Sequence, residues 1–528
     1  MNFNLPEMTN FDETIGMFKY YLIATGLCFL PLKGLTQYKI NEIGQRNVTI
    51  QIDTLHGLVE RVGCEGEEIH SICDTLTNQI YISGLEPSQY LTLCVEVKSK
   101  DGLNSFLDIP VLSQSKSSGE IKIFFNNPVD PDFQKENYAP DGTTFAALQN
   151  ELVLLIRNAK QTIDLAAYNT NETFLVNELK NAHSRGVVIR VVTDDETGNF
   201  GWADGAPFPI LYGNIGSGLM HNKFLIVDAE SMDSAWVVTG AMNFTTNQMR
   251  KDPNHLLFIQ DKSLAKAYTL EFNEMWGSSG SLPNLQNAKF GSQKTQNTPV
   301  FFNLNGIPVE LYFSPSDKTT QKIVSKLKQT KEEQLLALMI FTNWDLRDQV
   351  ADNLRDDIRT RWIVEDVEFS QSVINLVQNL NGSVRQHVEP EIFHHKYAIL
   401  DENTNQPVLI TGSHNWTYAA ETVNDENTLI FYDKRIANIF RQEFEARWKD
   451  ILTSTDNQAV NDKIKIFPNP SSGLVSFSKP LKNVCVLNNL GSPVLCFGNE
   501  VQQIFLDLPS GIYFLLHEEG SEKIFITR

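Results

Sequence analysis

One ordered set of residues occurs twice in this chain, and the duplication limits the possible folds more than any other feature. Each copy reads His-x-Lys-x-x-x-x-Asp, then Thr-Gly-x-x-Asn, and later Glu-Phe-x-x-x-Trp. The first copy runs from His221 to Trp276 and the second from His394 to Trp448. Chance recurrence of so long an ordered set is negligible, so we expect two homologous halves that fold alike.

Apolar periodicity around the two copies predicts strands and helices in turn. The predicted strands lie at residues 121–125, 162–168, 187–192, 309–313, 335–341 and 361–364. Helices are expected at 145–159 and 172–185, between the first three strands. Alternation of this kind is typical of α/β sandwiches. We therefore predict an α/β repeat at 119–278, a polar linker at 279–305 and a second repeat at 306–452.

Both flanks of the duplicated region are expected to be small β-sandwiches. Residues 37–118 and 460–528 contain short alternating strands separated by Gly, Pro, Asn and Asp turns. A chain of 528 residues is also too long for one hydrophobic core. The predicted fold class is therefore multidomain, with a duplicated α/β/α sandwich between N-terminal and C-terminal β-sandwiches.

The paired motifs resemble those of the phospholipase D superfamily, and the resemblance covers residues 120–452. It rests on both His-x-Lys-x-x-x-x-Asp motifs and on the Gly-x-x-Asn and Glu-Phe-x-x-x-Trp segments that follow them. The resemblance implies hydrolysis of a phosphodiester through a phosphohistidine, with no metal and no cofactor. The catalytic residues that it implies are His221, Lys223, His394 and Lys396. Since one chain carries both half-sites, we expect a monomer.

The residues themselves suit phosphoryl transfer. Apolar residues follow each His-x-Lys, so each motif should open a buried strand that carries His and Lys on one face. Two imidazoles and two ammonium groups can neutralise a phosphodiester, and Asn243 and Asn415 add neutral donors. One histidine then attacks phosphorus while the other donates a proton to the leaving alkoxide, and water hydrolyses the intermediate. His183, His255 and His387 show no metal-ligand spacing.

The supporting residues of the two halves are not equivalent. By analogy with the family, Asp228 and Asp401 tie their strands to neighbouring segments without touching the substrate. The second half carries Ser413 where the first half has Ala241. Losing this hydroxyl removes a phosphate contact or a supporting hydrogen bond, but no reacting group.

A second difference predicts unequal roles for the two histidines. A carboxylate beside an imidazole favours the protonated form. We expect Glu426 to support His394, which would stay protonated and act as the general acid. Asn254 occupies the matching place for His221, which would be neutral and free to attack phosphorus. Asp252 could also reach His221 and reduce this difference.

Three functions remain open from the sequence alone. The first is an exported phospholipase D that cleaves phospholipid headgroups, the second an exported nuclease with the same site, and the third an inactive surface adhesin. Two complete motifs argue against the adhesin. The formal net charge of −20 and the absence of a Lys/Arg-rich groove signature lean away from long nucleic acids.

Both ends of the chain predict export. Residues 1–36 read as an upstream extension followed by a signal peptide, with Met17 as the true start and cleavage before Gln37. The segment 84–90 and the strand after it resemble fibronectin type III domains. Residues 464–528 resemble the C-terminal sorting domain read by the type IX secretion system of certain Gram-negative bacteria. That machinery is therefore an expected partner, and the protein should be secreted or attached to the cell surface.

Four cysteines form two pairs that are close in sequence, Cys64 with Cys73 and Cys485 with Cys496. In an exported protein these pairs are disulfides or buried thiols, and the sequence leaves both open. A turn at 489–492 between two short strands would place Cys485 directly opposite Cys496.

Overall fold

The computed structural model divides between Ile451 and Leu452 into two compact units. The structure describes residues 38–53, 57–64, 70–74, 77–99, 104–195, 199–213, 218–387, 390–457, 466–469, 471, 473–488, 493–517 and 520–526. The signal peptide expected within 1–36 lies outside these ranges. Within them, no helix combines the length and the apolar character needed to cross a membrane.

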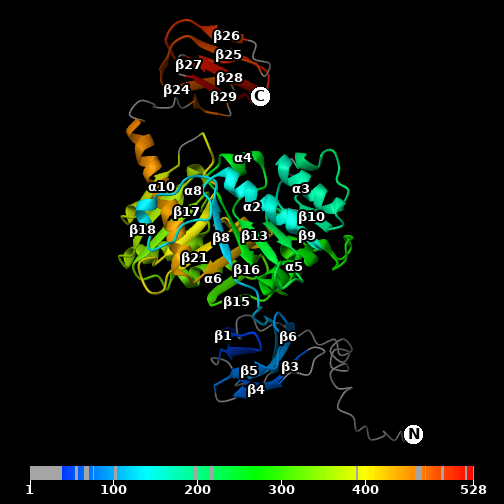
Figure 1. The fold of residues 1–528 in the computed structure, drawn as a ribbon. Helices are drawn as coiled ribbons and strands as arrows, with labels where there is room; N and C mark the ends of the chain where they lie inside the picture. The colour runs from blue at the N-terminus through cyan, green and yellow to red at the C-terminus, as the bar shows by residue number, and fades with distance from the viewer. Residues whose placement is uncertain are drawn as a thin grey trace, which may run out of the picture. The chain divides into compact units, whose positions relative to one another are not determined.

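Two similar sheets form the centre of the first unit (Figure 1). The first has the order β11-β10-β9-β12-β13-β14-β8. Its strands are β8 (Ile121–Phe125), β9 (Thr162–Ala167), β10 (Val188–Thr193), β11 (Ile210–Tyr212), β12 (Lys223–Val227), β13 (Trp236–Gly240) and β14 (His255–Gln260). Strands β9, β10 and β11 run parallel, whereas β12 pairs antiparallel with both β9 and β13.

The second sheet repeats this order and adds one strand: β15-β16-β22-β21-β20-β17-β18-β19. Its strands are β15 (Phe301–Leu304), β16 (Ile307–Ser314), β17 (Glu333–Leu338), β18 (Arg359–Val364), β19 (Ser383–Gln386), β20 (Lys396–Leu400), β21 (Val408–Gly412) and β22 (Glu426–Phe431). Strands β12 and β20 hold corresponding places. The extra strand β15 falls within the segment 279–305 that was expected to be a linker.

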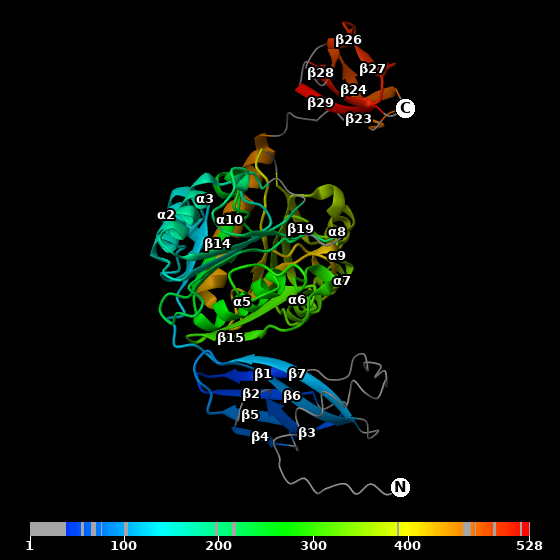
Figure 2. The same ribbon diagram turned by 90° about the vertical axis from the view of Figure 1, so that its right-hand side faces the viewer.

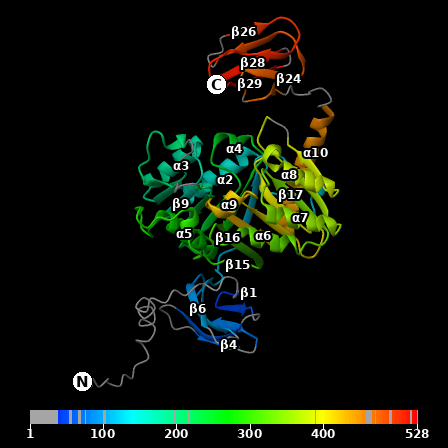
Figure 3. The same ribbon diagram turned by 180° about the vertical axis from the view of Figure 1, so that it is seen from behind.

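Helices cover the outer faces of the two sheets and fill the space between them. On the outside lie α2 (Phe145–Asn158) and α3 (Thr173–Ser184) of the first half, and α6 (Thr319–Leu327), α7 (Trp344–Arg355) and α8 (Val367–Asn379) of the second. Figures 2 and 3 show α2 and α3 on one side and α7 and α8 on the other. Between the sheets, α5 (Lys262–Trp276) and α10 (Lys434–Asn457) contribute Phe272, Trp276, Phe440 and Phe444 to one shared core.

Helices α2 and α5 begin with side-chain caps. Thr144 accepts a hydrogen bond from the Ala147 backbone N–H at the start of α2, and Asp261 accepts from Leu264 N–H at the start of α5. Helix α5 ends at Gly277, whose φ of 74° is left-handed and suits a residue without Cβ.

The N-terminal domain consists of two sheets, with the orders β1-β2-β5-β4 and β3-β6-β7. Their strands are β1 (Tyr38–Ile43), β2 (Asn47–Ile52), β3 (Gly57–Cys64), β4 (His70–Asp74), β5 (Gln79–Ser83), β6 (Tyr90–Ser99) and β7 (Asn104–Leu112). Alternating apolar residues of both sheets, such as Ile50 and Val95, share one core. Cys73 is a free thiol, and the side chain of Cys64 is not among those that the structure describes.

The second unit also contains two sheets, with the orders β23-β24-β27 and β26-β25-β28-β29. Their strands are β23 (Ile466–Phe467), β24 (Leu474–Leu481), β25 (Val484–Leu487), β26 (Pro493–Phe497), β27 (Val501–Phe505), β28 (Gly511–His517) and β29 (Gly520–Ile526). Cys485 pairs with Cys496 across β25 and β26 in a disulfide with a Cα–Cα distance of 4.1 Å. This confirms the register predicted for these two residues, although the turn at 489–492 lies outside the described residues.

Candidate active site

Each His-x-Lys motif stands at the beginning of a central strand. Lys223 is the first residue of β12 and Lys396 the first residue of β20, and every residue of both strands is buried. The side chains of His221 and His394 are also buried. The prediction that each motif opens a buried strand is therefore confirmed.

The aspartates of the motifs hold the far ends of these strands. The Asp228 carboxylate accepts hydrogen bonds of 2.7–3.2 Å from the backbone N–H groups of residues 160, 161 and 162, which lead into β9. The Asp401 carboxylate accepts from residues 331, 332 and 333, which lead into β17. Both aspartates adopt positive φ, 47° and 54°. As expected, they tie their strands to neighbouring segments.

The two halves exchange hydrogen bonds at the motifs. The His221 backbone N–H donates to the Asp425 carbonyl over 3.1 Å, and the His394 N–H donates to the Pro253 carbonyl over 3.1 Å. Asp425 immediately precedes β22 of the second half, and Pro253 stands two residues before β14 of the first. Each motif is thus held by the other half of the chain.

The carboxylate of Glu426 supports His221, not His394. The Nδ1 atom of His221 lies 2.8 Å from both carboxylate oxygens of Glu426. Against the effect of burial, His221 and Lys223 hold the pKa of Glu426 below its usual range, so this side chain is an ionised acceptor. The predicted pairing of Glu426 with His394 is wrong, because the segment before β22 reaches across to the first motif.

The support of His394 is a neutral amide. Asn254 Nδ2 lies 3.3 Å from His394 Nδ1 and donates to Gln248 Oε1 over 2.7 Å. Asn254 Oδ1 accepts from the His255 backbone N–H over 3.0 Å, which fixes the orientation of the amide. Because an amide nitrogen can only donate, His394 Nδ1 accepts and its proton resides on Nε2.

Asp252 lies on the His394 side of the site. Its carboxylate accepts from Gln248 Nε2 over 2.9 Å and from the Ile392 backbone N–H over 3.1 Å. Asp252 therefore orients Gln248, which in turn orients Asn254, and the proposed approach of Asp252 to His221 is wrong. Gln248 lies in the short helix α4 (Thr246–Arg250), outside every motif, and was not predicted as a supporting residue.

The lysines are buried beside the histidines and act on both of them. Lys223 Nζ donates to the His221 carbonyl over 2.6 Å, whereas Lys396 Nζ lies 3.1 Å from His394 Nδ1. Burial lowers the pKa of Lys223 to about 7 and that of Lys396 well below its usual value. Burial also lowers the pKa of His221 to about 4. Glu426 raises this pKa, whereas both lysines lower it further.

The pKa of His394 is lowered well below its usual value by burial, with contributions from Lys396, Lys223 and His221. Each lysine thus influences the histidine of the opposite half. The four side chains form one electrostatically coupled cluster that favours neutral imidazoles until an anion enters.

The asparagines of the Gly-x-x-Asn segments have unused hydrogen-bonding capacity. Asn243 Oδ1 and Asn415 Oδ1 are buried atoms without a hydrogen-bond partner among the described residues. Ser413 Oγ, by contrast, accepts from the Asn427 backbone N–H over 3.0 Å. The hydroxyl that Ala241 lacks therefore supports a neighbouring strand in the second half.

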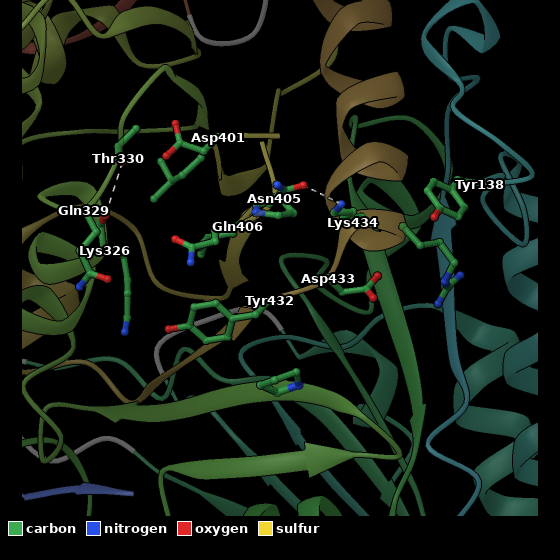
Figure 4. A pocket seen from close by; sticks show the side chains of 15 residues that line it. Tyr138, Lys326, Gln329, Thr330, Asp401, Asn405, Gln406, Tyr432, Asp433 and Lys434 are labelled. Atoms are coloured by element: carbon green, nitrogen blue, oxygen red, sulfur yellow. Dashed lines mark hydrogen bonds between the residues drawn. The ribbon is translucent and has the colours of Figure 1, made fainter. Parts of the chain in front are cut away.

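A hollow of about 700 Å³ lies away from the four His and Lys side chains of the motifs. Leu400 and Asp401, at the opposite end of β20 from Lys396, contribute to its lining (Figure 4). None of the four motif side chains lines it. Among the described residues, no group of three or more His, Cys, Asp or Glu side chains is placed to hold a metal ion.

Comparison with known families agrees with the duplication. Residues 152–276 and 323–448 each match the family described as "Cardiolipin synthase, PLD-like domain". These two ranges contain both His-x-Lys motifs, both supporting asparagines of the Gly-x-x-Asn segments, Asn254 and Glu426.

Curated relatives carry names of phosphodiester-cleaving enzymes. The chain is 29% identical over 134 residues to mitochondrial cardiolipin hydrolase of Xenopus tropicalis and 29% identical over 204 residues to that of Mus musculus. It is 25% identical over 141 residues to phospholipase D of Rickettsia prowazekii. These matches cover 24%, 37% and 26% of this chain and 60%, 90% and 66% of the relatives. The chain thus spans less than two thirds of the first and third relatives.

Among solved structures, phosphatidylserine synthase of Haemophilus influenzae is 14% identical, with a TM-score of 0.44 over 57% of this chain and 84% of that chain. Nuc of Salmonella typhimurium, a phospholipase D family member, is 23% identical, with a TM-score of 0.25 over 27% of this chain and 95% of that chain.

Proposed function

Since the chain contains two copies of a phospholipase D-like domain, we propose that it hydrolyses a phosphodiester in one active site built from both copies. The observation that carries this proposal is that each copy holds the histidine of the other. Glu426 of the second copy contacts His221, Asn254 of the first copy contacts His394, and both lysines lower the pKa values of both histidines in this buried cluster. A phosphodiester carries one negative charge, which two buried ammonium groups can neutralise.

The two histidines differ in tautomer, and this difference assigns their roles in the first step. His221 donates its Nδ1 proton to Glu426, so its Nε2 lone pair is free to attack phosphorus. His394 accepts at Nδ1 from Asn254 and carries its proton on Nε2, where it can donate to the leaving alkoxide. The assignment of His221 as the nucleophile is retained, although the reason is the opposite of the one predicted from the sequence.

Lys396 completes the proton transfer. As His394 Nε2 gives its proton to the leaving oxygen, Lys396 Nζ, 3.1 Å from Nδ1, passes a proton to Nδ1 and leaves the imidazole neutral. In the second step water gives a proton to Nε2, Nδ1 returns its proton to Lys396, and hydroxide displaces His221 from phosphorus. The lowered pKa of Lys396 suits a group that both gives and takes this proton.

We propose a phospholipid as the substrate, cleaved at the headgroup phosphodiester. The names of the curated relatives, cardiolipin hydrolase and phospholipase D, support this choice. The net charge of −20 disfavours the approach of a long polyanion such as DNA, but it also disfavours anionic membrane surfaces, so the choice of a lipid rests on the names of the relatives.

We further propose export, with a signal peptide that begins at Met17 and ends before Gln37, and with residues 460–528 as a sorting domain of the type IX kind. The separate compact unit after Ile451 and its disulfide between Cys485 and Cys496 support this proposal, since disulfides persist in oxidising compartments. A cell-fractionation experiment that finds the full chain in the cytoplasm would contradict it.

The proposed function is tested with the purified full chain and four substrates: cardiolipin vesicles, phosphatidylcholine vesicles, single-stranded DNA and duplex DNA. We expect release of phosphatidic acid or phosphatidylglycerol-type products from one or both lipids and no cleavage of DNA. Cleavage of DNA alone would replace the lipid assignment with a nuclease. Absence of turnover on all four would remove the hydrolase proposal.

A further inference from the structure

Behind the first His-x-Lys motif, four buried polar side chains form a hydrogen-bonded chain between the halves. Thr239 Oγ1 donates to Asn427 Oδ1 over 3.0 Å, and Asn427 Nδ2 donates to Asn222 Oδ1 over 3.0 Å. Asn222 Nδ2 then donates to Glu271 over 3.2 Å, and Glu271 is paired with the buried Lys294. Since Asn222 is the middle residue of the motif, this chain fixes the start of β12 from the face opposite His and Lys.

Behind the second motif, two histidines take the places of the two asparagines. Thr411 Oγ1 lies 2.7 Å from His255 Nε2, and His255 Nδ1 lies 3.0 Å from His395 Nδ1. His395 Nε2 lies 3.0 Å from Glu443. The ring planes of the two histidines are 10° apart and their centres 5.2 Å apart, so the rings meet through their nitrogens. His395 is the middle residue of the second motif.

The donors and acceptors of this second chain can be assigned from its carboxylate end. Burial raises the pKa of Glu443, but His395, Arg447 and Tyr397 lower it by more, so that it lies below its usual range. Glu443 is therefore an ionised acceptor. His395 Nε2 therefore donates. With a neutral ring, His395 Nδ1 accepts from His255 Nδ1, and the Thr411 hydroxyl then donates to His255 Nε2, so that the donors point from Thr to Glu as in the first chain.

We propose that His255 and His395 are positioning residues that act as uncharged substitutes for an amide pair. They hold the second catalytic motif as Asn427 and Asn222 hold the first. A neutral imidazole and a carboxamide each offer one in-line donor and one acceptor, so they can serve the same chain. The inference rests on the proposed function, because it concerns how the reacting His394 and Lys396 are held.

The two chains differ in their response to acid. An amide does not titrate, whereas an imidazole that takes up a proton has two donor nitrogens and no acceptor, so the order of donors and acceptors along the second chain must change. The surroundings oppose that proton at His255. Phe125, Phe440 and Tyr397 pack against the rings, burial lowers the pKa of His255 well below its usual value, and His395 and Lys396 lower it further. Glu443, Arg447 and His394 are the remaining charged or titratable neighbours.

The first test copies the asparagine pair into the second half. In the full chain, His395→Ala should lower kcat about 10- to 100-fold with little change in KM, as expected for displaced catalytic groups. Asn222→Ala, the matched variant of the other half, should do the same. The double variant His255→Asn/His395→Asn should recover at least about tenfold of the kcat lost in His395→Ala, and its activity should extend to lower pH than that of the wild type. A double variant as slow as the alanine variant, or His395→Ala with wild-type kcat, would overturn the proposal.

The second test does not depend on activity or on substitution. Nitrogen-15 NMR of the histidine-labelled full chain should show His395 protonated on Nε2 only and His255 on Nδ1 only at pH 7. A doubly protonated ring at either position at pH 7 would overturn the proposal even if the enzyme is active. A chain with these tautomers and no phosphodiesterase activity would instead contradict the proposed function alone.

Discussion

The two halves of the catalytic region share one sheet order but hold their histidines differently. Glu426 accepts the Nδ1 proton of His221, whereas Asn254 donates toward Nδ1 of His394. A carboxylate and an amide thus stabilise opposite tautomers in two otherwise equivalent positions. A duplicated scaffold can therefore give two identical residues different chemical roles through one substitution beside each of them.

The two lysines also differ in their contacts. Lys223 is directed to the backbone carbonyl of His221, whereas Lys396 also contacts the imidazole of His394. The anchoring aspartates show no such difference, since Asp228 and Asp401 accept the same three backbone hydrogen bonds in each half. The anchoring of the two strands is therefore symmetric, whereas the contacts of the lysines are not.

The largest expected effect comes from removing either histidine. His221→Ala and His394→Ala should each lower kcat by more than about 10⁴-fold, because each histidine is needed in both steps. His183→Ala, on the outer helix α3, is the control and should retain wild-type turnover. Initial rates on vesicles measure the effect. Substantial activity in either catalytic variant would show that the halves do not share one site.

The second-largest effect is expected from removing the lysines, and its size should differ between the two halves. Lys396→Ala should lose about 10³-fold in kcat and Lys223→Ala about 10²-fold, because both stabilise charge and only Lys396 contacts an imidazole ring. Lys396→Arg keeps the charge but should not restore the proton transfer. The comparison would fail if the two alanine variants were equally slow.

Glu426→Gln should lower kcat about 10- to 100-fold, since it replaces the ionised acceptor of the His221 Nδ1 proton with a neutral amide. Glu426 raises the pKa of His221, so its loss should lower that pKa, and the acid limb of kcat/KM should move to lower pH. Asn254→Ala, the matched change in the other half, should cost less. An acid limb that moved upward in Glu426→Gln would contradict the pairing.

The smallest expected effect is that of chelation. Two imidazoles and two ammonium groups provide the proton transfer and the charge neutralisation, so excess EDTA should leave kcat unchanged within error. Activity is compared before and after dialysis, with and without added zinc or magnesium. Loss of turnover that either metal restores would require a mechanism other than the one proposed.

Much of the architecture could be predicted because the motif spacing and apolar pattern are local. Lys223 and Lys396 begin their strands as expected, and the Asp228 and Asp401 carboxylates bind backbone as expected. The register of Cys485 and Cys496 followed from the position of one turn.

The partner of each histidine could not be predicted in the same way. Glu426 follows the second motif in sequence, yet the segment before β22 lies against the first motif. The spacing of residues along the chain does not show that each half supplies the partner of the other half's histidine. Aligning the halves would have placed His395 opposite Asn222 and His255 opposite Asn427. The signal for the second hydrogen-bonded chain therefore lies in these two pairs of matching positions.

The most direct test of unequal histidines is to trap the covalent intermediate. The full chain is mixed with a phosphodiester labelled at phosphorus, quenched within the first turnover under conditions that preserve phosphohistidine, and digested for peptide mapping. We expect the label on the peptide that contains His221. Label on the peptide that contains His394 would contradict the role assignment, and label on both peptides in equal amounts would contradict the difference between the halves.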